Sequence, residues 1–248
     1  MVVHGEDNTL PISLDMMIVH CKAVKRGSNR IFVIGDLPFG SYEESVQQAL
    51  SSAMRLVKEG GVDAVKLEGG SISRIDTAGK LIDAGIAVVG HVGLTPQSIG
   101  VLGGFRAQGK TAKVAMEIFQ AALKLQDVGC FAVVLECIPK PLADVITRAL
   151  KIPTIGIGAG NGTSGQILVF HDLLGFTQHP HHEKMSPKFC KQYAKVGENI
   201  HLGLNHYVSE VSTRSFPNQA FSPYEFEAEE HSKFLDDLRE AGFTNVLT

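Results

Sequence analysis

The sequence predicts an α/β fold of the (β/α)₈ TIM-barrel type, with only about six of the eight strand–helix units present. Short apolar runs alternate with helical segments, which is typical of a parallel sheet. Charged side chains gather where the runs end. An open doubly wound sheet is the competing architecture, but it would concentrate its site at one switch point. A barrel brings all strand ends to one mouth, so the spread of charges favours the barrel.

The elements follow one another in a regular order. Residues 13–27 predict a helix with Ser13 or Asp15 near its cap. Residues 41–63 keep a helical period that Gly60 and Gly61 end, and the segments 113–130 and 141–150 have the same period. The predicted strand runs are 31–38, 64–70, 87–93, 132–138, 153–160 and 165–172.

No seventh strand run follows, and the rest of the chain reads as loops and helices. We expect residues 1–224 to form the barrel domain, incomplete at its N-terminal side, and residues 225–248 to form a charged helical tail.

Composition excludes several classes of partner. The chain has 248 residues, of which 44% are hydrophobic and 20% charged, with a net charge of −3. This balance implies neither a nucleic acid nor a membrane surface as a partner, and no apolar stretch is long enough for a transmembrane helix. The four cysteines lack zinc or redox spacing, so we expect reduced thiols, with Cys137 in a packing role.

The segment AVKLEGG places Lys66 and Glu68 on the same side of a strand. A structural ion pair would be the simplest interpretation, although such pairs stabilise weakly. Asp36 ends the preceding strand run, and two carboxylates on neighbouring strand ends favour a hard cation such as Mg²⁺. Lys66 can then hold an anionic substrate.

Two further residues lie at strand ends. Glu136 ends an apolar strand, where burial raises a carboxyl pKa toward the range of a general base, although a salt-bridged glutamate is the alternative. His91 is expected to support substrate binding, against the alternative of a hydrogen-bonded structural histidine.

Two other motifs are weaker. The glycine-rich stretch 156–166 fits a tight turn after a strand better than a phosphate loop. The HPHH cluster at 179–182 could bind a metal, but a solvated surface loop is the better interpretation.

Several segments resemble, in order, the signature segments of the ketopantoate hydroxymethyltransferase family. They are TLPISLDMM, DLPFGSY, VKLEGG, GHVGLTPQS, LGGFRAQGK, VLECIP, IPTIGIGAG and GQILVFHDLLG. The resemblance runs to about residue 224. HPHHEKMSPKFCKQYA is most similar to plant forms, which implies a mitochondrial location; otherwise the chain would be cytoplasmic.

The resemblance implies a (β/α)₈ barrel, a homo-oligomer that is decameric in the full-length family, and a place in pantothenate and coenzyme A biosynthesis. The implied reaction transfers a hydroxymethyl group from 5,10-methylenetetrahydrofolate to 3-methyl-2-oxobutanoate, through an enolate stabilised by Mg²⁺, and gives 2-dehydropantoate. By motif, Asp36 would bind metal and substrate, Lys66 the substrate and Glu68 the metal. Glu136 would be the proton acceptor.

One family motif, similar to GDSLGMVV, is represented only by MVV at the start of this sequence. The resemblance therefore implies that an aspartate ligand, a substrate-binding serine and about two strand units are missing. From this we expect weak or no activity and poor solubility of the chain alone.

Three alternatives stay open. One is an aldolase that forms a Schiff base on Lys66. Another is a non-catalytic chain that joins oligomers of a full-length enzyme. A phosphosugar isomerase is the third, disfavoured because the glycine-rich loop carries no cation.

Overall fold

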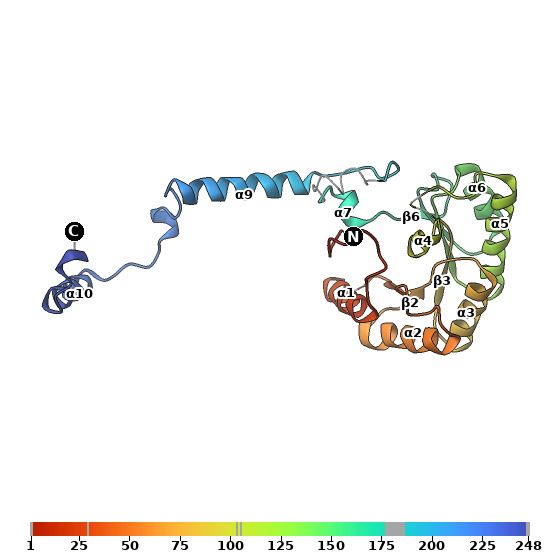
Figure 1. Ribbon diagram of the computed structural model, residues 1–248, viewed down its shortest axis with the longest axis horizontal. Coiled ribbons are helices and arrows are strands. Elements are labelled where there is room, and N and C mark those ends of the chain that lie inside the picture. Colours follow the sequence, from red (N-terminus) through yellow and green to blue (C-terminus); the bar gives the residue numbers. More distant parts are fainter. Residues whose placement is uncertain (1, 29, 103, 105, 177–186, 247–248) are drawn as a thin grey trace. The chain divides into compact units, whose positions relative to one another are not determined.

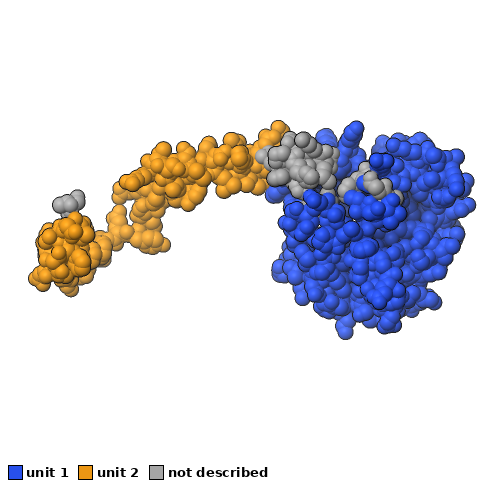
Figure 2. Space-filling model, in the orientation of Figure 1, with its two compact units in different colours: residues 1–194 blue, residues 195–248 orange. Residues whose placement is uncertain are grey.

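The computed structural model describes residues 2–28, 30–102, 104, 106–176 and 187–246. Within this part, the chain divides into two compact units, residues 1–194 and residues 195–248 (Figure 2). The boundary predicted at residue 224 is not tested by this division and stays a prediction.

The first unit is built on a six-stranded parallel sheet in the order β1-β2-β3-β4-β5-β6, so each strand pairs with its neighbour in sequence. This is the order of a partial (β/α)₈ barrel, and the prediction of about six strands is confirmed. The strands are β1 (Ile34–Asp36), β2 (Ala64–Lys66), β3 (Val88–Gly93), β4 (Ala132–Glu136), β5 (Thr154–Ile157) and β6 (Gly165–Gln166).

Helices line the outer side of the curled sheet (Figure 1). Four of these helices begin at a capping side chain: Ser13, Ser45, Ser71 and Thr111 each accept a backbone N–H of the first turn. The elements are α1 (Leu14–Gly27), α2 (Val46–Gly60), α3 (Ile72–Asp83), the 3₁₀ turn η1 (Pro96–Ser98), α4 (Ile99–Leu102), α5 (Ala112–Asp127), α6 (Lys140–Ala149) and α7 (Phe170–Leu173).

The sheet has two different faces. The helix face carries side chains such as Val65, Val88 and Leu135, which belong to the main hydrophobic core. The inner face carries a small apolar cluster around Val89 and Val134, with polar side chains above it at the carboxyl end. Alternation along each strand produces this division.

The last predicted strand is wrong in its extent. The run 165–172 gives a strand only over Gly165–Gln166, and α7 begins at Phe170. Among the described strands, only β5 pairs with β6, so few backbone hydrogen bonds are available to keep residues 167–172 extended. Ile167 and Val169 are accordingly exposed.

The second unit contains α9 (Val196–Ser212), the 3₁₀ turn η2 (Gln219–Phe221), α10 (Ala228–Glu240) and the 3₁₀ turn η3 (Thr244–Val246). Nearly all its described side chains are exposed. Among the described residues of the whole chain, no helix is long and apolar enough to cross a membrane.

Candidate active site

The five residues singled out by sequence lie together at the carboxyl end of the sheet. Asp36, Lys66 and Glu136 are the last residues of β1, β2 and β4, and Asp36 pairs in register with Lys66. His91 lies within β3, and Glu68 follows β2 by two residues. The geometry therefore unites all five, while their individual roles stay predictions.

Lys66 contacts three of the other four residues, Asp36, Glu68 and His91. Its Nζ lies 3.1 Å from Asp36 Oδ2 and 3.9 Å from Glu68 Oε1. Burial by itself lowers the pKa of Lys66, but the carboxylates of Asp36 and Glu68 outweigh burial and raise the pKa above its ordinary value. Lys66 is therefore a charged ammonium group.

His91 is fully enclosed, with 1% of its side chain exposed. Burial first, and then the charge of Lys66, hold the pKa of His91 well below its ordinary value, so the ring is neutral. Its Nε2 lies 2.7 Å from the carbonyl oxygen of Leu94, and its Nδ1 lies 3.4 Å from Lys66 Nζ. Because a carbonyl can only accept and an ammonium can only donate, we assign the proton to Nε2.

Glu136 lies next to this ring, with its Oε2 3.5 Å from His91 Nε2. Since His91 is neutral, this contact is a weak polar contact rather than an ion pair. Burial raises the pKa of Glu136 to about 7, and the charges of Glu68 and Asp36 add to the effect while Lys66 opposes it. A carboxylate with this pKa can accept a proton near neutral pH.

The backbone beside Glu136 is tightly packed. Gly93, the last residue of β3, has a φ of +101°, and the next N–H, that of Leu94, donates to the Glu136 carbonyl at 2.9 Å. A side-chain carbon at position 93 would overlap that carbonyl oxygen. Only glycine combines this φ with so close an approach.

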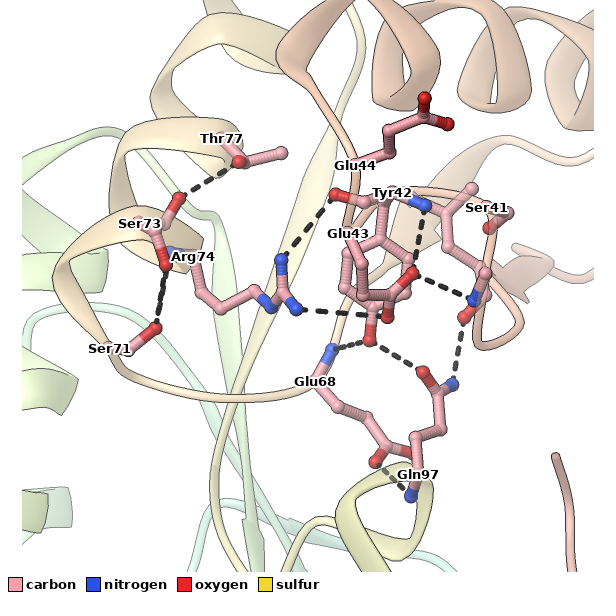
Figure 3. A network of polar contacts seen from close by, with 12 residues as sticks. Ser41, Tyr42, Glu43, Glu44, Glu68, Ser71, Ser73, Arg74, Thr77 and Gln97 are labelled. Carbon is pink, nitrogen blue, oxygen red and sulfur yellow. Dashed lines mark hydrogen bonds and ion pairs between the residues drawn. The ribbon is translucent and has the colours of Figure 1, made fainter.

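Glu68 is held by a polar network that sequence reasoning missed (Figure 3). Its Oε2 accepts the backbone N–H of Gln97 at 3.0 Å, and its own N–H donates to the Tyr42 hydroxyl at 3.3 Å. Burial raises the pKa of Glu68, against the opposing effects of Lys66 and the Gln97 N–H. No periodicity marks Tyr42 or Gln97, although both lie in segments that resemble signature segments of the family, DLPFGSY and GHVGLTPQS.

The carboxylates of Asp36 and Glu68 fit a divalent cation in part. Asp36 and Glu68 come from separate strands, and both contact one ammonium group. Mg²⁺ is commonly bound by one or two carboxylates, with water and substrate oxygens completing its shell. Within the described ranges, no group of three or more His, Cys, Asp or Glu side chains could hold a metal.

The structure tests the predictions for the glycine-rich stretch and the cysteines, but not the prediction for the HPHH cluster. The predicted turn after β5 is confirmed, since Gly158 and Gly160 both have positive φ. All four cysteines are free, and burial raises the pKa of Cys137 to about 11, so its thiol is protonated. The HPHH cluster at 179–182 lies outside the described residues.

Comparison with known proteins gives one family. A family model described as ketopantoate hydroxymethyltransferase matches residues 1–219. The chain is 60% identical, over 100% of its own length and 72% of the relative, to 3-methyl-2-oxobutanoate hydroxymethyltransferase 1, mitochondrial, of Arabidopsis thaliana. For the protein of the same name in Oryza sativa subsp. japonica, identity is 58% over 98% of the chain and 66% of the relative.

A bacterial relative is similar over nearly the same span. It is the 3-methyl-2-oxobutanoate hydroxymethyltransferase of Heliobacterium modesticaldum, with 47% identity over 96% of the chain and 80% of the relative.

Proposed function

The chain belongs to the ketopantoate hydroxymethyltransferase family, and from this membership we propose that it transfers a hydroxymethyl group to 3-methyl-2-oxobutanoate. The donor is 5,10-methylenetetrahydrofolate and the product 2-dehydropantoate. Glu136 carries the proposal, because a buried strand-end carboxyl with a pKa of about 7 suits the removal of a proton from carbon.

Each residue at the strand ends has a separate role in the proposed reaction. Lys66, as a charged ammonium group, holds the anionic oxo acid and offsets the charge that develops on its keto oxygen. Glu136 accepts the proton from C3, and the electron pair left on C3 forms the new bond to the methylene carbon of the folate. The two bonds from that carbon to folate nitrogens break, water supplies the hydroxyl oxygen, and tetrahydrofolate leaves. Neutral His91 contacts both Lys66 and Glu136 and adds no charge to the site.

Asp36 and Glu68 would hold Mg²⁺. When bound, the ion supplies a Lewis acid that polarises the keto carbonyl of the oxo acid. The assignment rests on the oxygen donors of the two carboxylates and on their shared contact with Lys66.

The first half of the reaction can be tested without the folate. The oxo acid is incubated with the chain and Mg²⁺ in D₂O, and its C3–H signal is followed by NMR. We expect exchange of C3–H for deuterium that EDTA abolishes and added Mg²⁺ restores. Exchange equal to that of a protein-free sample would contradict the proposal. Complete turnover is then measured with 5,10-methylenetetrahydrofolate present.

The Schiff-base alternative is disfavoured by one observation. A lysine nucleophile must lose its proton, and the carboxylates around Lys66 raise its pKa instead. Borohydride reduction in the presence of the oxo acid should leave Lys66 unlabelled by mass spectrometry. A reduced adduct on Lys66, together with turnover that is indifferent to EDTA, would favour the aldolase.

We also propose a mitochondrial location and a homo-oligomeric state, decameric as the resemblance implies. The plant relatives named mitochondrial support the location. Light scattering coupled to gel filtration tests the oligomer. A chain that assembles with a longer relative but shows no turnover would favour the non-catalytic alternative.

A further inference from the structure

The side chain of Gln97 links two loops that the proposed reaction does not use directly. Gln97 lies in η1 and is 8% exposed. Its Nε2 donates to the Leu37 carbonyl at 2.8 Å, and its Oε1 accepts the Tyr42 hydroxyl at 2.6 Å. Turning the amide over would set two oxygens against each other at Leu37, so the network fixes its orientation.

The same two residues hold Glu68 from both sides (Figure 3). The Gln97 N–H occupies Oε2 of Glu68, and the Tyr42 hydroxyl receives the Glu68 N–H. The other carboxylate oxygen, Oε1, is the one directed at Lys66, 3.9 Å from its Nζ. One oxygen is thus anchored, and the other is presented to the site.

The network also reaches the strand of Asp36. Leu37 directly follows Asp36, and its N–H donates to the Lys66 carbonyl at 2.9 Å while its carbonyl accepts from Gln97. Tyr42 is itself held, since the Arg74 guanidinium lies over its ring at 4.8 Å from the centroid. Gln97 therefore contacts the Glu68 carboxylate directly and binds the backbone of the residue that follows Asp36.

We propose that Tyr42 and Gln97 are positioning residues that direct Glu68 Oε1 toward Lys66 and thereby set the affinity of the site for a divalent cation. The inference rests on the proposed function in one respect, the role of Asp36 and Glu68 as cation ligands. Partners that orient ligating carboxylates change metal affinity by about 10- to 100-fold when removed.

The test measures binding of Mn²⁺, used in place of Mg²⁺, by the electron paramagnetic resonance signal of the free ion. We expect Gln97→Met and Tyr42→Phe each to weaken binding about tenfold, and Glu68→Gln to weaken it further. In turnover assays, the two positioning variants should raise the KM for Mg²⁺ and recover kcat when Mg²⁺ is saturating.

Matched controls separate this effect from general damage. Gln47→Met changes an exposed glutamine of α2, and Tyr193→Phe removes an exposed hydroxyl; both should bind Mn²⁺ like the unchanged chain. Circular dichroism verifies folding, and if Gln97→Met does not fold, Tyr42→Phe decides, because it removes a single oxygen.

The outcomes distinguish the two proposals. Unchanged Mn²⁺ affinity in the folded positioning variants, with a loss in Glu68→Gln, would overturn the positioning role alone. An unchanged affinity in Glu68→Gln, or no binding by the unchanged chain, would overturn the cation assignment and the positioning role with it.

Discussion

The two faces of β4 differ in what they contribute. Val133 and Leu135 point to the helix face and are fully buried in the main core. Val134 and Glu136 point to the inner face, where a small apolar cluster ends in a titrating carboxyl. One strand of five residues therefore serves stability on one side and chemistry on the other. Substitutions on the two faces should separate these properties.

The largest expected effect is on the inner face. Glu136→Gln keeps the shape of the side chain but cannot accept a proton, so kcat should fall by about 10²- to 10⁴-fold. Turnover and C3–H exchange should fall together. Glu117→Gln, an exposed change on α5, is the control. Exchange that persists in Glu136→Gln would assign the base to another residue.

On the helix face, Leu135→Ala should lower the free energy of unfolding by about 2–5 kcal/mol, because a cavity replaces a fully buried side chain. Urea denaturation measures this effect. Activity per folded molecule should change little. As a control, Leu204→Ala on α9, where the side chain is 59% exposed, should change the free energy by less than about 0.5 kcal/mol. Equal costs at both positions would contradict the burial described here.

A smaller expected effect is a pH dependence of the free energy of unfolding, caused by Glu136 on the inner face. The folded-state pKa of Glu136 is about 7, above its ordinary value of 4.5, so between these values the folded chain binds more protons than the unfolded chain. Stability should therefore fall as pH rises through this window, by at most about 3 kcal/mol from this group. Glu136→Gln should flatten that part of the profile. Parallel profiles for both chains would contradict the raised pKa.

The smallest expected effect is that the protonation state of His91 does not change with pH. Because its pKa lies well below the ordinary value, its ring should stay neutral, with the proton on Nε2, from pH 8 down to pH 6. Nitrogen NMR of a histidine-labelled chain measures the protonation of both ring nitrogens of His91 directly. A His91 signal that titrates near pH 6.5 would contradict the neutral assignment.

The sequence anticipated the residues whose position follows from local alternation. Asp36, Lys66 and Glu136 could be placed at strand ends because apolar runs show where strands stop, and parallel strands share one carboxyl end. The family resemblance then supplied the roles. The extent of β6 could not be predicted, because the run 165–172 is as apolar as a true strand and only its pairing limits it.

Tyr42 and Gln97 escaped prediction for a different reason. The hydrogen bond between them joins residues 55 positions apart, and neither residue belongs to a periodic pattern. Their importance depends on which loops meet after β1, β2 and β3 are assembled. The family signature segments DLPFGSY and GHVGLTPQS contain these residues, but the segments do not indicate that the two side chains meet.

The contact at Gly93 limits how this site could be redesigned. Since no side chain fits between the end of β3 and the Glu136 carbonyl, a library intended to accept bulkier oxo acids gains nothing from position 93. Substitutions are better made at Val134 and Ile155, which are paired inner-face positions that already carry apolar side chains.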